Sequence, residues 1–402
     1  MKIVSVFFFN IKISTSNKED ELVEKKEGIT MKKKCFLLMA IMISCLVLMK
    51  GFALADLNDV AVSPRATVSE LAPLTEEEMA AAQPLIIERA IEEGQEPISC
   101  PVVEQPVGET VVFPSSPGEM GAKYSTTPFE VNDTEIEPQT YPSDAAYSYP
   151  FPFTRLEVFN VKRGAYRKFP YRTIGQLFFY IPGLGSARCT ASVAQEKWVW
   201  TAGHCVVSPP ENWHTNFTFR PGARKTKKPF GTWKWDNDTV SLVGWSSDGY
   251  LCYDIGAVRF KKKKFGTKRK TLAQRVGHLG FMYGASREQH WNEFGYPAAS
   301  PFDGTKLIQS QSSIGEDDTL TDPSADCGDP GAPLPIGVGN DMTGGSSGGP
   351  WIVDFSGEAG STNYINSVNS FKYTSPYRPG AVYGPYFGTG AMNIWNYMTA
   401  NP

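Results

Sequence analysis

The feature that most constrains the fold of this chain is a series of short apolar runs separated by turn residues. The chain has 37 glycines and 30 prolines. Both residues end regular elements, since glycine adopts positive φ and proline lacks a backbone N–H. Runs of strand length in such a setting favour an all-β barrel or sandwich over a helical bundle. The strand candidates are 174–181, 190–200, 240–245, 255–260, 352–355 and 364–371.

The first 55 residues have the pattern of a secretory signal behind an extension. Met31 is followed by three lysines, by the apolar run 35–49 and by the small-residue motif Ala53-Leu54-Ala55. These are the basic, apolar and cleavage regions of a signal peptide. The apolar run is shorter than the roughly 20 residues of a spanning helix. We therefore expect residues 1–30 to be an upstream extension from a mis-assigned start, and 31–55 to be a cleaved signal. The protein would then be secreted or periplasmic, with no stable membrane insertion.

The charge is divided unevenly along the chain. Residues 56–150 carry 18 acidic and 3 basic residues, whereas 151–402 carry 27 basic and 19 acidic ones. The acidic part is also rich in Pro, Ser and Thr, which predicts weak structure. One helix is expected in it, opened by a capping box at Thr75 and Glu78, running towards Glu93 and interrupted near Pro84. We interpret 56–165 as an acidic pro-region and linker that docks on a folded domain of residues 166–402. A simple spacer or stalk is the alternative.

Five cysteines remain after the signal: Cys100, Cys189, Cys205, Cys252 and Cys327. Export implies an oxidising compartment, in which disulfides persist. Cys189 and Cys205 lie across an expected hairpin, and a bridge between them would contribute about 3 kcal/mol on the chain-entropy model. Cys252 and Cys327 could form a second bridge and leave Cys100 free. Alternatively, Cys100 could tether the pro-region to the domain, and the sequence leaves both pairings open.

The segment TGGSSGGPW, residues 343–351, is suited to hold a nucleophilic serine. Ser347 lies among glycines, which allow a tight turn and leave room for a carbonyl group to approach. The backbone N–H groups of Gly345 and Ser347 are the candidate donors to an oxyanion. A glycine- and serine-rich loop without chemistry is the alternative for this segment alone.

Two further segments supply a candidate base and its partner. His204 lies in TAGHC, which follows the apolar stretch 198–200, and Asp254 leads the apolar strand of YDIGAVRF. A carboxylate at the start of a buried strand is costly unless it has a partner, and an imidazole N–H would provide one. His204 and Cys205 have no second ligand pair at a metal-binding spacing, so we expect no metal and no other cofactor.

The order His204, Asp254, Ser347 is that of chymotrypsin rather than of subtilisin or the α/β-hydrolases. The blocks TAGHC, YDIGAV and GGSSGGP resemble the signatures of chymotrypsin-like (trypsin-like) serine peptidases. The resemblance covers roughly residues 170–398 and is closest to the bacterial branch with the glutamyl endopeptidases. It implies two six-stranded antiparallel barrels, the catalytic triad in the cleft between them, and protein or peptide substrates. A catalytically silent, protease-like binding domain and an esterase are the rival functions.

The resemblance also suggests residues that bind substrate. Asp341 lies six residues before Ser347, where trypsin-like enzymes carry the carboxylate at the base of the pocket. Thr343, two residues further on, is also expected to bind substrate. This position favours Arg or Lys before the cut, although Asp341 could also be an exposed turn residue. Ser370 and Phe371 would pair with the substrate backbone.

Asn369 stands where the glutamyl enzymes use a histidine, which argues against glutamyl specificity. Ser346 replaces the aspartate of the pancreatic enzymes, so an ion pair between that position and a new N-terminus is not expected. The basic pairs Lys162-Arg163 and Arg167-Lys168 are candidate sites for removal of the pro-region.

A basic run at 261–264 and 268–270 is accompanied by no nucleic-acid recognition motif. We interpret it as a solvated loop and expect no nucleic-acid partner. The protein is expected to act as a monomer.

Overall fold

The computed structural model describes residues 56–65, 73–90, 110–120, 152–161, 164–313, 315–329, 332–357, 360, 362–374 and 380–402. The predicted extension and signal peptide, Cys100 and the pair Lys162-Arg163 lie outside these residues. Within the described part, no helix has the length and apolar character needed to cross a membrane.

The first half of the domain is a closed barrel of six antiparallel strands. Its order is β12-β11-β6-β7-β8-β13, and pairing of β13 with β12 closes the ring. The strands are β6 (Ile174–Ile181), β7 (Gly185–Gln195), β8 (Trp198–Thr201), β11 (Thr215–Pro221), β12 (Trp233–Leu242) and β13 (Gly256–Phe260). Val199, Phe219 and Val258 are fully buried in these strands. Trp198 and Trp200 are also buried, and they pack on the rings of Tyr397 and Phe281. The all-β prediction is therefore confirmed, and the first barrel has the expected number of strands.

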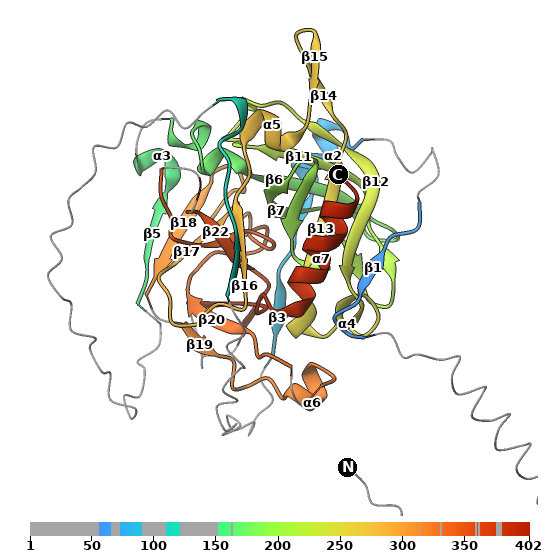
Figure 1. Cartoon of the computed structure of the whole chain (residues 1–402), viewed down its shortest axis with the longest axis vertical. Helices are drawn as coiled ribbons and strands as arrows, with labels where there is room; N and C mark the ends of the chain where they lie inside the picture. Colours follow the sequence, from blue (N-terminus) through green and yellow to red (C-terminus); the bar gives the residue numbers. More distant parts are fainter. Residues whose placement is uncertain are drawn as a thin grey trace, which may run out of the picture. The chain divides into compact units, whose positions relative to one another are not determined.

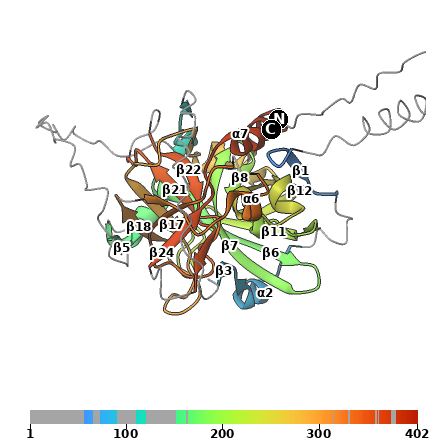
Figure 2. The same cartoon turned by 90° about the horizontal axis from the view of Figure 1, so that it is seen from below.

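The second half consists of two sheets. The seven-stranded sheet runs β4 (Val111–Phe113), β16 (Gly280–Tyr283), β22 (Tyr364–Val368), β21 (Pro350–Val353), β17 (Trp291–Gly295), β18 (Ile308–Ser312) and β5 (Thr154–Glu157). The five-stranded sheet runs β19 (Gly315–Asp317), β20 (Ile336–Gly339), β24 (Ala381–Gly384), β23 (Phe371–Tyr373) and β3 (Ile87–Arg89). The stretch 364–371, expected as one strand, is thus divided between β22 and β23. Figure 2 shows β17, β21 and β24 on one side and β6, β7 and β11 on the other.

Short helices complete the domain. They are α2 (Glu76–Ala81), α3 (Val158–Val161), α4 (Val243–Ser246), α5 (Leu272–Val276), α6 (Pro323–Asp326) and α7 (Thr389–Ala400). In α7, Ile394 and Met398 are buried in a hydrophobic core that includes residues of both halves, and Trp395 stacks on Phe281 of β16 at 4.9 Å between ring centres. Figure 1 shows α7 crossing in front of β13. The C-terminal helix therefore joins the two halves.

The stretch 240–245 departs from the predicted strand. The strand β12 ends at Leu242, and α4 begins at Val243. A Cβ atom at Gly244 would lie 2.6 Å from the ring of Tyr253, so the chain can pass here only without a side chain. This contact brings α4 against the turn that precedes Asp254.

The region before residue 166 supplies edge strands to both halves. The strand β1 (Val60–Val62) pairs with β12, β2 (Gln83–Pro84) with β7, and β3, β4 and β5 with strands of the second half. The helix α2 has the predicted capping box at Thr75. It ends at Ala81 instead of continuing, since Gln83 and Pro84 join β7 and Pro84 cannot donate to a helix.

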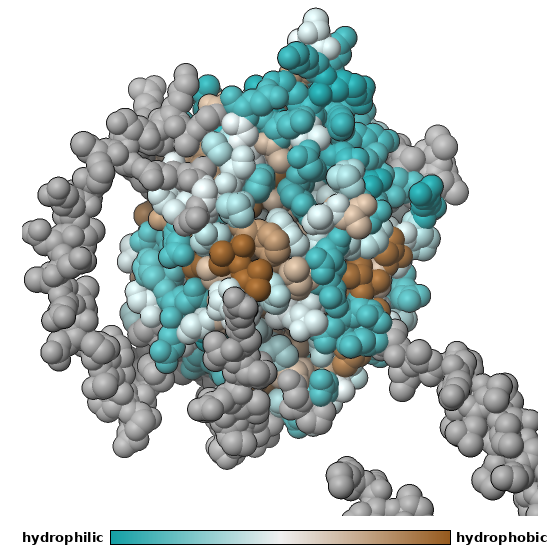
Figure 3. Space-filling view, in the orientation of Figure 1, coloured by the Kyte–Doolittle hydropathy of each residue, from teal (hydrophilic) through white to brown (hydrophobic). Residues whose placement is uncertain are grey.

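The basic run forms a hairpin rather than an irregular loop. The strands β14 (Lys263–Phe265) and β15 (Lys268–Lys270) are paired, and they project from the domain at the top of Figure 1. Hydrophilic residues dominate this part of the surface in Figure 3. The ring of Phe265, next to the turn of the hairpin, packs 5.8 Å from that of Trp233. The predicted solvation of the lysines is consistent with this arrangement.

Two disulfides are present among the described residues. Cys189 is bonded to Cys205, as predicted, and Cys252 is bonded to Cys327. The sequence left the partners of Cys252 and Cys327 open. In the structure these two cysteines are bonded to each other, so neither of them is paired with Cys100. It closes 75 residues and joins the turn before Asp254 to the end of α6.

We expect replacement of Cys252 and Cys327 by serine to lower the free energy of unfolding by about 4 kcal/mol, the chain-entropy value for a loop of this length. Urea unfolding of the oxidised protein and of the double variant measures the difference. The matched double variant at Cys189 and Cys205 should lose about 3 kcal/mol on the same model, since its loop is shorter. An unchanged midpoint for the Cys252 and Cys327 variant would contradict the role given to this bridge.

Buried His214 gives the stability of the domain a pH dependence. Its Nδ1–H donates to the Cys205 carbonyl at 3.1 Å, and Ser208 Oγ–H donates to Nε2 at 2.9 Å. Burial lowers its pKa to about 4. Below pH about 6.5 the unfolded chain gains a proton on this residue that the folded protein gains only near pH 4, so unfolding becomes easier as the pH falls through this window.

We expect the wild type to lose about 2 kcal/mol more stability than His214→Asn between pH 7.5 and pH 4.5. Asparagine retains a donor for the Cys205 carbonyl but does not titrate. Urea unfolding of both proteins at the two pH values measures the effect. Equal losses in the two proteins would show that His214 does not titrate in this window.

Candidate active site

Asp254 and His204 form a buried pair between two adjacent strands. His204 follows β8 and Asp254 precedes β13, and pairing of Thr201 with Gly256 holds the two segments together. His204 Nδ1–H donates to one carboxylate oxygen at 2.7 Å, and the His204 backbone N–H donates to the other at 2.6 Å. Asp254 has no exposed surface, so these donors replace the water that its charge has lost. The bond at Nδ1 leaves Nε2 as the acceptor nitrogen.

A third donor to Asp254 comes from the second half. Ser370 Oγ–H donates to the same oxygen as the His204 ring, at 2.5 Å. The sequence assigned Ser370 to the substrate backbone and missed this contact. A serine just before a short apolar strand carries no local sign of such a partner. The contact brings the start of β23 to the His204 pair.

Ser347 lies in a turn that only glycines permit. Gly345 and Gly348 have φ angles of +95° and +75°, in the left-handed region. A Cβ atom at Gly348 would lie 2.0 Å from Thr201 Oγ1 and 2.8 Å from the backbone nitrogen of Ala202. The turn that carries Ser347 therefore lies directly against the residues that lead into His204.

Thr190 of β7 holds this turn in place and was not predicted from the sequence. Its backbone N–H donates to the carbonyl of Ser347 at 2.8 Å, and its Oγ1–H donates to the carbonyl of Gly345 at 2.9 Å. Oγ1 also accepts from the backbone N–H of Tyr296 at 2.9 Å. Thr190 of the first barrel thus holds the turn of Ser347 and the backbone of Tyr296, both of which belong to the second half.

One candidate oxyanion donor, the backbone N–H of Gly345, and the hydroxyl of Ser347 both contact a carbonyl oxygen of the upstream region. The Gly345 backbone N–H donates to the Leu85 carbonyl at 2.7 Å, and Ser347 Oγ–H donates to the same oxygen at 2.9 Å. His204 Nε2 is buried and has no hydrogen-bond partner within the described part of the chain. The hydroxyl of Ser347 is therefore directed to Leu85 rather than to His204.

The other residues expected to bind substrate lie in different surroundings. Asp341 is partly exposed and forms an ion pair with Arg155 of β5. Thr343 Oγ1–H donates to the Ala299 carbonyl at 2.7 Å. Phe371 is buried and pairs with Ile87 of β3. Arg155 could not be linked to Asp341 from the sequence, since 186 residues separate them.

Asn369 is fully buried, and its side chain forms hydrogen bonds only inside the protein. Its amide donates to the carbonyls of Phe294 and Ser346 at 3.0 and 3.1 Å, and its oxygen accepts from Trp351 Nε1 at 2.8 Å. The structure thus uses Asn369 to tie β17, β21 and the turn of Ser347 together.

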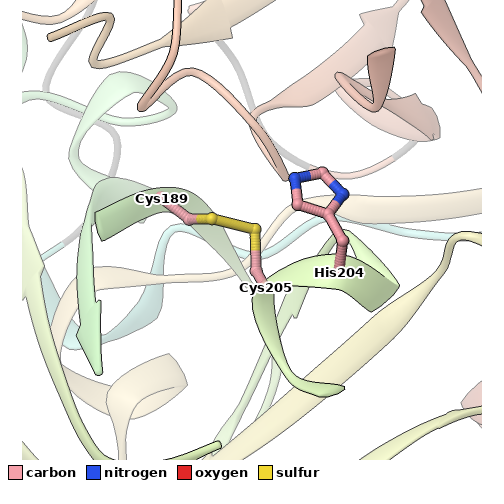
Figure 4. A group of neighbouring side chains, drawn as sticks. All are labelled: Cys189, His204 and Cys205. Carbon is pink, nitrogen blue, oxygen red and sulfur yellow. A yellow bond between two sulfur atoms is a disulfide. The ribbon is translucent and has the colours of Figure 1, made fainter. Parts of the chain in front are cut away.

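Cys189, His204 and Cys205 form a compact group, shown in Figure 4. The two sulfur atoms are bonded to each other at 2.04 Å, and His204 Nδ1 is already bonded to Asp254. A metal ion needs deprotonated thiolates as ligands. The disulfide leaves neither sulfur in that form, so this group has the composition but not the chemistry of a metal site.

Comparisons with known proteins relate the chain to a family. The family model "Trypsin" matches residues 168–383. Over 92 residues the chain is 35% identical to the extracellular metalloprotease of Bacillus subtilis (strain 168), a match that covers 23% of this chain and 29% of that protein. The chain therefore spans less than a third of that curated relative.

Solved structures of serine proteases are also similar. Protease Anisep from Arthrobacter nicotinovorans is 32% identical, with a TM-score of 0.48, and the match covers 57% of this chain and 96% of that one. The thermostable serine protease AL20 from an extremophilic microorganism is 29% identical and has the same TM-score. That match covers 57% of this chain and 98% of the other. A Glu endopeptidase is 17% identical, with a TM-score of 0.45, over 61% of this chain and 96% of its own. At these TM-scores the likeness gives no argument for the glutamyl branch.

The family match is the decisive comparison, because it covers more than half of the 402 residues and includes all three segments that carry His204, Asp254 and Ser347. The chain belongs to the trypsin family of chymotrypsin-like serine peptidases.

Proposed function

We propose that His204, Asp254 and Ser347 are the catalytic triad of an exported, monomeric endopeptidase that is made as a precursor. In this proposal residues 31–55 direct export, and residues 56–165 are a pro-region removed at one of the basic pairs near residue 165. The two disulfides support an oxidising compartment for the folded protein. The proposed mechanism needs no metal or cofactor.

The observation that carries the proposal is the convergence of Gly345 N–H and Ser347 Oγ on one carbonyl oxygen. A scissile carbonyl at this place would lie beside the nucleophile and at the same time beside a fixed N–H donor. Such a donor stabilises the negative charge that develops on the oxygen as the tetrahedral intermediate forms. A serine-rich loop without chemistry would not require these two groups to point to one atom.

The bond between His204 and Asp254 supports the proposed reaction. Ser347 Oγ attacks the carbonyl carbon while His204 Nε2 takes its proton, and Asp254 stabilises the resulting imidazolium through Nδ1–H. The N–H groups of Gly345 and Ser347 hold the oxyanion. His204 then gives the proton to the leaving amine, and water hydrolyses the acyl-enzyme with His204 again as base.

We expect the processed domain to react with a fluorophosphonate probe at Ser347, and Ser347→Ala to show no labelling. Asp254→Asn should label about 10⁴-fold more slowly, since the imidazole loses the partner that sets its tautomer. Gel fluorescence over time measures the rates. Ser346→Ala is the matched control, because the Ser346 hydroxyl donates to the Thr343 carbonyl and not to the reacting atoms. Unlabelled wild type in folded, processed form would indicate a silent binding domain.

A preference for Arg or Lys before the cut is proposed from Asp341. The carboxylate already pairs with a guanidinium, that of Arg155 in the region before the domain. Removal of that region would release Arg155 and leave the carboxylate available to a basic side chain of the substrate.

On a peptide library we expect cuts after Arg and Lys, and at least a roughly tenfold loss of kcat/KM for these substrates in Asp341→Asn, since a charged hydrogen bond contributes about 1.5–3 kcal/mol. Asp354→Asn is the control, because Asp354 is an exposed acid at the end of β21. Cuts after Glu in the wild type, or an unchanged preference in Asp341→Asn, would remove Asp341 from the pocket.

A further inference from the structure

A short segment of the upstream region lies across the candidate active site. Gln83 and Pro84 form β2, which pairs with Ala187 and Arg188 of β7. Ile87–Arg89 form β3, which pairs with Phe371–Tyr373 of β23. In Figures 1 and 2, β3 lies between the strands of the two halves. The segment therefore joins an edge of the first barrel to an edge of the second half.

Leu85, between β2 and β3, lies at the catalytic centre itself. Its N–H donates to the Arg188 carbonyl at 3.1 Å, and its carbonyl accepts from Gly345 N–H and Ser347 Oγ–H. A Cβ atom at neighbouring Gly344 would lie 3.0 Å from the Pro84 carbonyl, so the segment passes close to the backbone of this turn. The place of a scissile carbonyl is thus filled by Leu85.

The direction of the segment distinguishes it from a substrate. The strand β23 begins next to Ser370, which holds Asp254, and runs away from the catalytic residues. A substrate whose acyl half pairs with β23 must end at Ser347, so it runs antiparallel to β23. The pairing of β3 with β23 is parallel. The residues after Leu85, on the leaving-group side of its carbonyl, therefore occupy the strand edge that the acyl half would need.

The reversed direction has a chemical consequence. In a productive complex the leaving nitrogen must receive a proton from His204. Here the nitrogen of Ile86 lies on the β23 side of the Leu85 carbonyl, which is the acyl side in the proposed mechanism. The Ser347 hydroxyl donates a hydrogen bond to the Leu85 carbonyl and not to His204, so the nucleophile is not activated either. Both features predict slow cleavage of the Leu85–Ile86 bond.

The C-terminal end of the segment is anchored by Arg89. Its guanidinium donates to Asp326 at 2.7 Å and to Thr321 Oγ1 at 3.0 Å, and it lies 5.9 Å from the ring centre of Tyr373. Behind it, buried Asp318 accepts from the hydroxyls of Thr321 and Tyr373 at 2.6 and 2.7 Å. These groups fix the position of the pocket, so Arg89 enters a site that is already organised.

The N-terminal end is anchored by α2. Glu76 accepts from Arg220 at 2.7 Å and from Lys228 at 2.6 Å. Leu74, Met79 and Ala82 pack on Phe178 of β6. Anchors at both ends of a seven-residue segment restrict it to the path through Leu85.

We propose that Gln83–Arg89 is an internal inhibitor of this peptidase, which crosses the active site in the non-productive direction and is held by Arg89 in the pocket of Thr321, Asp326 and Tyr373. The proposal rests on the proposed function, since it assumes that Ser347 is the nucleophile. In this proposal the pocket binds Arg89, an arginine of the same polypeptide chain.

The test compares the precursor, residues 56–402, with the processed domain purified away from the excised region. We expect the precursor to react with a fluorophosphonate probe at least about a hundredfold more slowly than the processed domain, because the probe needs the site of the Leu85 carbonyl. Arg89→Ala should speed labelling of the precursor about tenfold or more, as expected for loss of a charged hydrogen bond. Arg89→Lys should restore part of the inhibition.

Arg65→Ala is the matched control, since Arg65 is an exposed arginine of the same upstream region. Thermal unfolding of each precursor shows whether the variant is folded. A precursor that labels as fast as the processed domain, or equal rates for the wild type and Arg89→Ala, would overturn the inhibitor while leaving the triad intact. Absence of labelling in the processed domain would instead overturn the proposed function and the inhibitor with it.

Mass spectrometry of the wild-type precursor tests the direction of binding. We expect the bond between Leu85 and Ile86 to remain intact while bonds near residue 165 are cut. An acyl-enzyme on Ser347 that ends in Leu85, or an accumulating fragment that begins at Ile86, would show that the segment binds as a substrate. That result would overturn the reversed binding mode.

Discussion

The buried carboxylate of Asp254 is the constraint on which the candidate site depends. It has no exposed surface and accepts from the ring and backbone of His204 and from Ser370. A buried carboxylate that loses a partner costs several kcal/mol, so each donor segment has to stay in place. The pairing of β8 with β13 and the bridge from Cys252 to Cys327 hold the segments around it. The charge that orients His204 thus also fixes the start of β23.

Thr190 provides the corresponding constraint on the nucleophile. It binds the carbonyls of Gly345 and Ser347 and accepts from Tyr296, so the turn of Ser347 is positioned relative to the first barrel. The neighbouring carbonyl of β7, that of Arg188, accepts from Leu85. The same strand therefore positions both the nucleophile and the segment that covers it. A segment bound in this way contacts the site through backbone groups, which do not depend on a particular substrate side chain.

Local signals in the sequence were sufficient for part of this structure. The apolar run 174–181 is β6, the capping box at Thr75 begins α2, and Cys189 is bonded to Cys205. Each of these features is determined within about 20 residues of chain. The family match confirms the peptidase, and the structure brings the segments of His204, Asp254 and Ser347 together.

The contacts that the sequence could not supply join residues far apart in the chain. Leu85 and Ser347 are 262 residues apart, and Ser370 and Asp254 are 116 apart. Their partners depend on how the two halves meet, which no periodicity or spacing within one segment encodes. Asn369 illustrates the same limit, because its alignment with a pocket residue gave no indication that its amide is enclosed by Phe294, Ser346 and Trp351.

The opposite charges of the two regions predicted docking, but charge alone does not explain the position of the bound segment. The carboxylates of Glu76, Glu88 and Glu119 pair with basic residues of the domain, yet each is more than half exposed. Exposed pairs contribute little and are screened by salt. Arg89 is one of only three basic residues in 56–150, and it pairs with Asp326 where both side chains are largely buried. The overall charge can therefore draw the region to the domain, whereas the pairing of β2 and β3 and one arginine of opposite sign determine where the chain crosses Ser347.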